Sequence, residues 1–319
     1  MDASKADNED KIELYIRKYI FQSQEEYSRP LAKLLQRCQE HYFQERGFKA
    51  YTAELERLCG GLKGKKILEI GSGSGGRTVA LALEGAEIYG IEPNESGVMA
   101  SCYRSKRYPG LKATFAVGVG EYLGFKNNFF DLIITYSVLE HVRDIDRVLR
   151  ETFRVLKEGG FTYHHTENNL WPRENHYRIF WPPLCPKHLA RVYVKLRGKN
   201  PKFLSHLNYI TPSFLRIKLG KALFFNIRDV GAEGMIEKFN NPESISLFLP
   251  RWVAKLSSFI GLNRILGKSL AKSGIYSSTL MLAQKPDKKE KLKSLHLKNL
   301  KDQRVQRKQQ SRERVKVLQ

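Results

Sequence analysis

A short glycine-rich stretch, KKILEIGSGSGGRT at residues 65–78, constrains the fold of this chain more than any other part of it. The apolar run 67–70, interrupted only by Glu69, is typical of a buried parallel strand with one functional residue near its end. Four glycines follow within six residues, so the chain turns sharply and a ligand can lie against bare backbone. Because a helix is expected to start at Arg77, this order of elements predicts a site for a nucleotide-like cofactor.

The glycine spacing leaves two classes of cofactor open, because Gly71, Gly73 and Gly76 also satisfy the GxGxxG pattern of dinucleotide sites. Two acids bear on the choice. Glu69 stands two residues before Gly71, where a carboxylate can receive an ammonium group, which a dinucleotide lacks. The next predicted strand ends in Glu92, placed to accept hydrogen bonds from two ribose hydroxyls. Both classes of cofactor need that second acid.

Motifs further along the chain add a family resemblance. FDLIITYSVLEHV, at residues 130–142, reads as a strand that runs into a loop and a short turn, and RVLKEGGFTYHHTEN follows it. Together with ExGxGxG and the acid that ends the second strand, these motifs resemble the class I S-adenosylmethionine-dependent methyltransferases over roughly residues 60–170. The resemblance implies S-adenosylmethionine as cofactor. It implies as binding residues Glu69, Gly71, Ser72, Gly73, Gly75, Glu92, Pro93, Gly120, Glu121 and Tyr136.

From residue 60 onward predicted strands and helices alternate, which indicates an α/β fold with a doubly wound, mostly parallel sheet. The resemblance implies a Rossmann-like sheet of seven strands that ends in an antiparallel hairpin. We expect the strands at 65–70, 86–91, 112–118, 130–136, 160–166, 223–230 and 276–283. A helix is expected at 144–156, ended by Glu158, Gly159 and Gly160.

We expect three regions: an N-terminal helical cap at 1–58, the methyltransferase domain at 59–284 with an insertion at 171–212, and a basic tail at 285–319, helical or disordered. In the first region, Pro30 breaks an apolar pattern at helical spacing, which predicts two helices. These helices either cap the sheet or help to close the substrate site with Tyr42, Phe43 and Tyr51, as amino-terminal helices do in the family.

Length and composition indicate the size of the core and the cellular compartment to expect for this chain. The chain of 319 residues can bury a full core, and its four cysteines show no CxxC pair or metal-ligand spacing. We expect them to be free thiols in a reducing compartment. The amino terminus MDASKADNED does not resemble a secretory signal, and no apolar run approaches the ~20 residues that a membrane span needs. The expected localisation is cytoplasmic.

The net charge of +22 is concentrated in two segments. Residues 173–226 carry eleven Lys or Arg against one acid, and residues 285–319 carry thirteen against four. Basic segments of this kind usually meet the phosphates of nucleic acid, anionic lipid or a substrate.

Apolar residues accompany the basic ones in the insertion, where Leu189, Val192, Val194 and Leu196 alternate with lysines and arginines. This mixture suits an amphipathic helix at a membrane surface, and residues 245–266 are a second candidate. The alternative for both is a lid helix that packs onto the core. The insertion also resembles those of methyltransferases of surface-glycan and lipid-linked sugar assembly. We therefore expect peripheral contact with the cytoplasmic face of an anionic membrane, and nucleic acid as the less favoured partner.

Histidines are the candidate catalytic bases, because transfer of a methyl group to an alcohol releases a proton. His141 follows the fourth strand, whose carboxyl end faces the ligand crevice in sheets of this kind. His176 lies among aromatic residues just after the fifth strand. His164 and His165 end that strand on opposite sides, so at most one of them faces the site. We take His141, His176 and His165 as candidates, with a structural role as the alternative for each.

Two positions depart from the motifs of the family. Val119 stands where an acid usually binds the amino group of adenine, so either Glu121 or backbone groups replace it, or adenine packs against Tyr122 and Leu123. Some quinone O-methyltransferases have ExxEH at the segment 137–141 and bind a metal ion with both acids and the histidine. Here Ser137 replaces the first acid, which leaves a short ligand set for a hard cation, and no metal is expected.

The expected function is S-adenosylmethionine-dependent O-methylation of a sugar, glycan or lipid-linked acceptor. An RNA methyltransferase and an inactive RNA- or membrane-binding scaffold of the same fold are the alternatives. Intact Glu69, Gly71, Gly73 and Glu92 favour an enzyme, because a scaffold needs no cofactor carboxylates at those spacings. The chain also lacks an NPPY or DPPY tetrad and any RNP or zinc-finger pattern, which disfavours nucleic acid.

Overall fold

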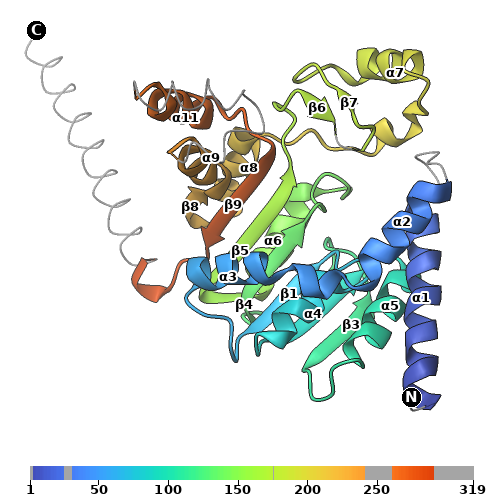
Figure 1. Cartoon of the computed structure of the whole chain (residues 1–319). Helices are drawn as coiled ribbons and strands as arrows, with labels where there is room; N and C mark the ends of the chain where they lie inside the picture. The colour runs from blue at the N-terminus through green and yellow to red at the C-terminus, as the bar shows by residue number, and fades with distance from the viewer. Residues whose placement is uncertain (1–2, 25–30, 175, 241–260, 291–319) are drawn as a thin grey trace, which may run out of the picture.

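The computed structural model describes residues 3–24, 31–174, 176–240 and 261–290. Its centre is one sheet of seven strands in the order β3-β2-β1-β4-β5-β9-β8 (Figure 1). The strands are β1 (Lys66–Ile70), β2 (Glu87–Glu92), β3 (Ala113–Val117), β4 (Phe130–Tyr136), β5 (Leu156–Glu167), β8 (Phe225–Asp229) and β9 (Ser278–Gln284). The first five pair in parallel, and β9 runs antiparallel to both β5 and β8. The predicted α/β fold is confirmed.

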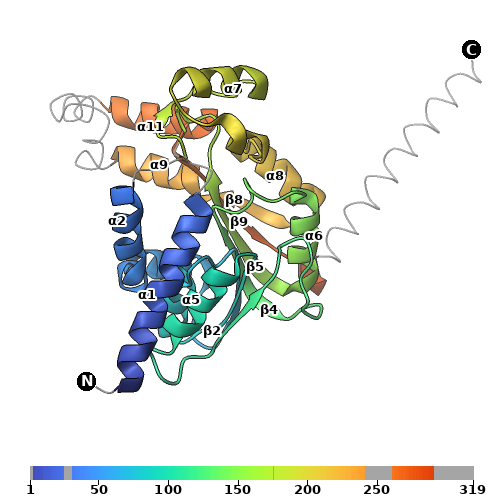
Figure 2. The same ribbon diagram turned by 90° about the vertical axis from the view of Figure 1, so that its right-hand side faces the viewer.

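Helices cover both faces of the sheet, as Figure 2 shows. On one face, α6 (Ile145–Val155) and α8 (Pro212–Lys221) pack on Leu68, Ile70 and Ile133. On the other, α3 (Lys49–Cys59) and α4 (Gly76–Leu83) pack on Ile67 and Ile134. Adjacent residues of one strand thus enter different cores, which explains why these strands are continuous apolar runs. The described part of the domain outside the insertion also contains α5 (Glu95–Ser105), α9 (Val230–Asn240) and α11 (Leu262–Ser273).

The fifth strand starts earlier than predicted. Helix α6 ends at Val155, and β5 follows at once, so Gly159 and Gly160 lie inside the strand and do not end the helix. The early start comes from an irregularity in the pairing of β4 with β5. Phe130 pairs with Leu156, but the next pair is Leu132 with Phe161, so the register shifts between them. Gly159 has a φ of 76°, and its amide donates to the carbonyl of Lys285 at 2.9 Å.

The antiparallel end of the sheet is not a tight hairpin. Strands β8 and β9 pair as expected, but α9 and α11 lie between them in the sequence. Lys285, predicted as the first residue of a solvated tail, is buried, and its ammonium group donates to three oxygens at 2.7 Å, those of Asn128 Oδ1 and of the carbonyls of Phe153 and Leu156. Residues 291–319 of the predicted tail lie outside the described residues.

The described residues of the N-terminal region form three α-helices where two were predicted: α1 (Ala3–Gln24), α2 (Leu31–Tyr42) and α3, with a 3-10 turn η2 (Gln44–Gly47) before α3. The third was missed because its buried stripe of Thr52, Leu55 and Leu58 is short and contains a polar residue. Helix α1 lies along α5 in both views, with Ile12, Ile16 and Ile20 buried between them.

The insertion forms a small unit beyond the carboxyl end of β5 (Figure 1). It contains the two-stranded pair β6 (Arg173–Glu174) and β7 (Ile179–Phe180), helix α7 (Lys187–Leu196) and the 3-10 turn η3 (Pro201–Ser205). These elements share an apolar core of their own, with Trp181, Ala190, Val194, Phe203, Leu204 and Leu207 among its members. The predicted amphipathic helix is α7, whereas residues 245–260 of the second candidate lie outside the described residues.

None of the described helices combines the length and the apolar character that crossing a membrane requires. All four cysteines are free thiols, as predicted.

Candidate active site

The glycine loop connects β1 to α4 at the carboxyl edge of the sheet. Gly71, Gly73 and Gly75 adopt φ values of 74°, 57° and 79°, which only glycine adopts without strain. A Cβ atom on Gly71 would lie 2.3 Å from Val138 Cγ2, so the loop has no room for a side chain there. The hydroxyl of Ser72 is buried without a hydrogen-bond partner among the described residues. The loop therefore offers bare backbone and one open polar group.

Glu92 ends β2 beside this loop and is buried. Its Oε2 accepts from the amide of Gly73 at 3.0 Å, and its Oε1 accepts from the amide of Asn94 at 3.1 Å. Burial raises the pKa of Glu92, while the two amides act in the opposite direction. Each oxygen keeps a lone pair, so the carboxylate is fixed in place and still able to accept from a diol. Pro93, also predicted to bind the cofactor, is exposed.

Glu69 lies in β1, fully buried, and already has two partners. Its Oε1 lies 3.2 Å from Arg77 Nε, and its Oε2 accepts from the Thr78 hydroxyl. Burial raises the pKa of Glu69, and Arg77 acts against that rise. The guanidinium of Arg77 also lies 3.8 Å from the ring centre of Tyr136, which stacks on the His165 ring at 3.8 Å. An incoming ammonium group would therefore compete with Arg77 for Glu69.

Glu121, one of the alternatives for binding adenine, has partners in the loop before α6. Its Oε1 accepts from the amides of Arg143 and Asp144, at 2.9 and 3.4 Å, just before α6. Tyr122 is mostly exposed beneath the Arg147 guanidinium, and Leu123 belongs to the core around α6. Glu121 therefore binds the neighbouring loop and Leu123 packs in the core. A local sequence motif cannot show these partners, because they are distant along the chain.

Gly120, predicted to bind the cofactor with Glu121, is packed tightly. A Cβ atom there would lie 2.9 Å from Ile70 Cγ2 and 3.3 Å from Val148. Backbone groups at this position thus remain the open alternative for adenine.

The N-terminal helices approach the loop with two tyrosines. The Tyr19 hydroxyl would lie 3.0 Å from a Cβ atom on Gly73, so α1 covers this part of the loop. Tyr51, from α3, packs edge-on against Tyr136, and its buried hydroxyl has no partner among the described residues. Of the three aromatic residues predicted for this role, only Tyr51 reaches the site. Tyr42 donates to Glu9, and Phe43 is exposed.

The two histidines near the carboxyl end of β5 differ in role, as their alternation predicts. His164 is fully buried between Thr135 Oγ1, at 2.8 Å from Nδ1, and Thr162 Oγ1, at 3.0 Å from Nε2. Burial lowers its pKa to about 3, so it is a neutral structural residue. His165 stacks on Tyr136 and has a buried Nδ1 without a partner in the described part of the chain. Burial, followed by the charge of Arg77, lowers the pKa of His165 to about 4.

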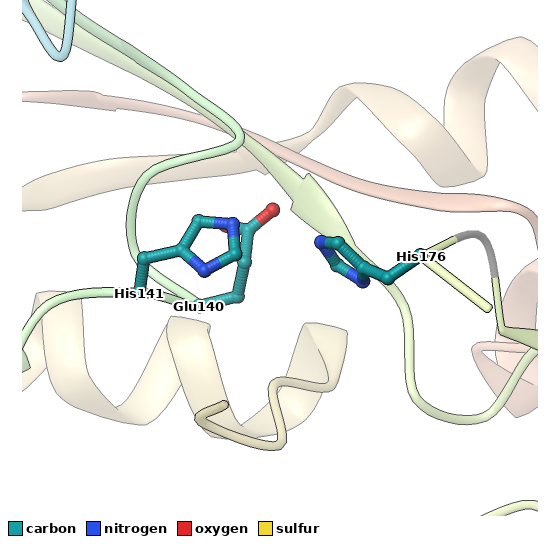
Figure 3. A group of neighbouring side chains, drawn as sticks. All are labelled: Glu140, His141 and His176. Carbon is teal, nitrogen blue, oxygen red and sulfur yellow. The ribbon is translucent and has the colours of Figure 1, made fainter. Parts of the chain in front are cut away.

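His141 and His176 meet although they are far apart in the sequence (Figure 3). Their ring centres lie 5.3 Å apart, edge to face, and Phe203 packs against both. His176 Nδ1 lies 2.6 Å from Glu174 Oε1 and 3.7 Å from Glu167 Oε2. Burial alone would lower the pKa of His176, but these carboxylates raise it above its usual value.

Glu140 completes the group. It is 2% exposed, and its Oε2 accepts from the Thr166 hydroxyl at 2.7 Å. Its Oε1 is buried without a partner among the described residues, and burial raises the pKa of Glu140 to about 7. The sequence placed His141 and His176 in the site but not in contact. Glu174 and Glu167 were missed, although Glu174 stands two residues before His176 in RENHYR.

A comparison with known protein families matches the segment that carries the glycine loop, Glu92, Glu140 and His141. A model of the family described as "Methyltransferase domain" matches residues 68–164. This segment is a methyltransferase domain. The strand order of the sheet and the match agree with the class I S-adenosylmethionine-dependent methyltransferases that the motifs resemble.

Curated relatives match about a third of the chain. The chain is 32% identical over 107 residues to a ubiquinone biosynthesis O-methyltransferase of Pelagibacter ubique, covering 34% of this chain and 44% of that protein. It is 40% identical over 101 residues to squalene methyltransferase 1 of Botryococcus braunii, covering 30% of this chain and 26% of that protein. The chain thus spans half or less of the length of these curated relatives. A solved structure of phosphoethanolamine N-methyltransferase 2 of Haemonchus contortus superposes with a TM-score of 0.48 and 17% identity, covering 75% of this chain and 53% of that one.

The cofactor of such a domain, S-adenosylmethionine, fits the residues present. The glycine loop presents backbone without side chains, Glu92 is held where it can accept from ribose hydroxyls, and Glu69 is a buried acid for the ammonium group. The open hydroxyl of Ser72 is a further polar group that a ligand can satisfy.

Proposed function

We propose that the whole chain is an S-adenosylmethionine-dependent O-methyltransferase that acts on a hydroxyl group of a lipid-linked or lipid-soluble acceptor. The observation that carries the proposal is a set of buried polar atoms without partners in the described part of the chain, at the carboxyl ends of β1, β4 and β5 or facing them. They are Tyr51 Oη, Ser72 Oγ, Glu140 Oε1 and His165 Nδ1. Native proteins rarely leave such atoms open, and a site that binds a polar ligand is a standard reason.

The residues divide the work of the transfer. When bound, the cofactor supplies the methyl group on a sulfonium. Glu92 and the glycine loop hold its ribose and fix the direction of attack, which is the largest contribution expected in a displacement of this kind. The proton of the acceptor hydroxyl passes to the cluster of Glu140, His141 and His176, and Glu174 fixes the His176 ring through Nδ1. His165 lines the site beside Tyr136.

The outer face of α7 supports a lipid-associated acceptor. Ala190 and Val194 are buried in the insertion, whereas Leu189, Val192 and Leu196 are 54%, 58% and 80% exposed. Basic residues share this helix, and apolar side chains with lysines and arginines suit a membrane interface. Relatives named for ubiquinone biosynthesis and squalene point to apolar acceptors as well. A lipid-linked sugar combines a hydroxyl acceptor with such an anchor.

Transfer of a labelled methyl group tests the proposal. The full chain is incubated with radiolabelled S-adenosylmethionine and fractionated lipid, glycan and RNA extracts, beside the variants Glu92→Gln and His176→Gln. We expect label in the lipid fraction, loss of about 10²–10⁴-fold in rate for His176→Gln, and normal rate for His188→Gln, which changes an exposed histidine of α7. Label in RNA alone would make the chain an RNA methyltransferase. Cofactor binding without label in any fraction would favour an inactive scaffold, and both outcomes overturn the proposal.

A further inference from the structure

Three side chains around the unpartnered oxygen of Glu140 form a compact set of ligand atoms. One atom each from Glu140, His141 and His176 lies within 4.8 Å of the other two. Glu140 and His141 follow β4, whereas His176 comes from the insertion between β6 and β7 (Figure 3). The Glu140 carboxylate and the His176 ring point toward one another in that view. Two imidazoles and a carboxylate at such spacing are a common ligand set for metal ions.

Neighbouring residues orient Glu140 and His176 so that each can bind a metal ion. Glu174 Oε1 lies 2.6 Å from His176 Nδ1, which directs Nε2 away from Glu174. A carboxylate on the far nitrogen of a metal-binding histidine is the usual outer support of such a ligand. The Thr166 hydroxyl occupies one oxygen of Glu140 and leaves Oε1 for the centre of the group. The insertion is tied to this loop, because Asn208 donates to the carbonyls of Leu139 and Val142.

The buried, open oxygen of Glu140 is the second observation that points to a ligand. A carboxylate that is 98% buried and keeps one oxygen without a donor costs free energy unless a positive group meets it. Among the described residues, no lysine or arginine forms an ion pair with Glu140. A cation between the two rings would meet this oxygen and lie within reach of one nitrogen of each imidazole.

We propose that Glu140, His141 and His176 bind one divalent transition-metal ion, with Glu174 as the outer support of His176. Nitrogen ligands favour zinc, iron or cobalt over magnesium, calcium and manganese, which are better suited to oxygen ligands. The set differs from the ExxEH arrangement, because Ser137 supplies no carboxylate and the third ligand comes from the insertion. Three protein ligands leave a position open for the acceptor oxygen. With the ion bound, the ion in place of the three side chains would promote loss of the hydroxyl proton, which would pass to water. Only this last role rests on the proposed function; binding of the ion does not.

Direct titration of metal ions tests the proposal without any reference to turnover. The full chain, stripped with a chelator, is titrated calorimetrically with Zn²⁺, Mn²⁺ and Mg²⁺, and Co²⁺ binding is followed by its visible absorption. We expect one Zn²⁺ site, a Co²⁺ spectrum of a site with nitrogen ligands, and much weaker binding of Mg²⁺. His176→Gln and Glu140→Gln should lose the site. Glu174→Gln should weaken it about 10–100-fold, because the supporting carboxylate is gone.

His188→Gln is the matched control, and S-adenosylmethionine binding by every variant shows that the fold survives. Equal Zn²⁺ affinity in His176→Gln and His188→Gln would overturn the proposal, as would the absence of any bound Zn²⁺ or Co²⁺ in the unmodified chain. A chain that binds the ion but transfers no methyl group would keep this inference and remove the proposed function.

Discussion

We expect cofactor binding to depend directly on Glu92. Its oxygens are fixed by two backbone amides, so it meets a diol without reorganisation. We expect Glu92→Gln to weaken S-adenosylmethionine binding by about 1.5–3 kcal/mol, because a charged acceptor is replaced by an amide with one donor end. Calorimetry gives the affinity, and Glu95→Gln, three residues on and exposed in α5, is the control. Equal affinities of the two variants would contradict the role given to Glu92.

At the scale of single residues, the sequence predicted the arrangement of those site residues that are close together along the chain. Glu69, the glycines and Glu92 lie within one strand-loop-helix unit or at the end of the next strand, so their separation along the chain fixes their separation in space. The same reasoning did not predict the hydrogen-bond partners of Glu121, which lie just before α6. It also missed that Glu174 binds His176 and that both meet Glu140. Segments before and after the fifth strand must fold against each other to bring these residues together.

The N-terminal helices are joined to the glycine loop by one buried arginine. Arg104, on α5, donates through Nε to the carbonyl of Ser74 in the loop at 2.9 Å and through Nη2 to the carbonyl of His41 at 2.6 Å. Its Nη1 pairs with Glu45 of η2, and both side chains are fully buried. The cap therefore supports the loop as well as the sheet. This supporting role was not visible in the sequence, because its partners are mostly backbone carbonyls.

This arrangement predicts a pH-dependent contribution of Glu45. Burial alone would raise its pKa, but Arg104 and Arg107 hold it below the usual value of 4.5. A depressed pKa stabilises the fold above the unfolded value and loses that effect as the pH falls through the folded one. Glu45→Gln should cost about 3–5 kcal/mol at pH 7, because a buried charge loses its partner, and the cost should shrink below about pH 4.5.

Urea unfolding of Glu45→Gln and the unmodified chain at pH 7, 5 and 3.5 measures this difference. Titration of the other carboxylates affects both chains and cancels in the comparison. Glu56→Gln, exposed on α3, should change the free energy of unfolding little at any of these pH values. If Glu45→Gln lowered the free energy of unfolding by the same amount at all three pH values, the lowered pKa assigned to Glu45 would be contradicted.

At the scale of the whole molecule, the structure describes helix α7 of the basic insertion, whereas residues 291–319 of the basic tail lie outside the described residues. Helix α7 presents Leu189, Val192 and Leu196 outward. Changing all three to serine should abolish flotation with anionic liposomes and leave cofactor binding intact, because these side chains lie outside the apolar core of the insertion. Ile217→Ser, on an exposed position of α8, is the control.

A chain ending at Pro286 separates the tail from the insertion in the same assay, and Lys285 stays in place in it. We expect this chain to float with anionic liposomes and not with neutral ones. Filter binding to RNA runs in parallel, because salt weakens both kinds of contact. Tight RNA binding without liposome association would contradict the membrane assignment. Loss of all flotation on truncation would move the contact to the tail.

Because β9 lies between β5 and β8 in the sheet, the sheet can be completed only late in synthesis of the chain. Strands β1 to β5 and the glycine loop are complete once residue 167 has emerged from the ribosome, whereas β8 has no neighbour in the sheet until residues 278–284 follow. During that interval β5 is an open edge, the kind of surface that pairs with foreign strands. A nascent chain at this stage carries a finished cofactor loop on an unfinished sheet. Early capture of S-adenosylmethionine would then act on folding yield before it acts on catalysis.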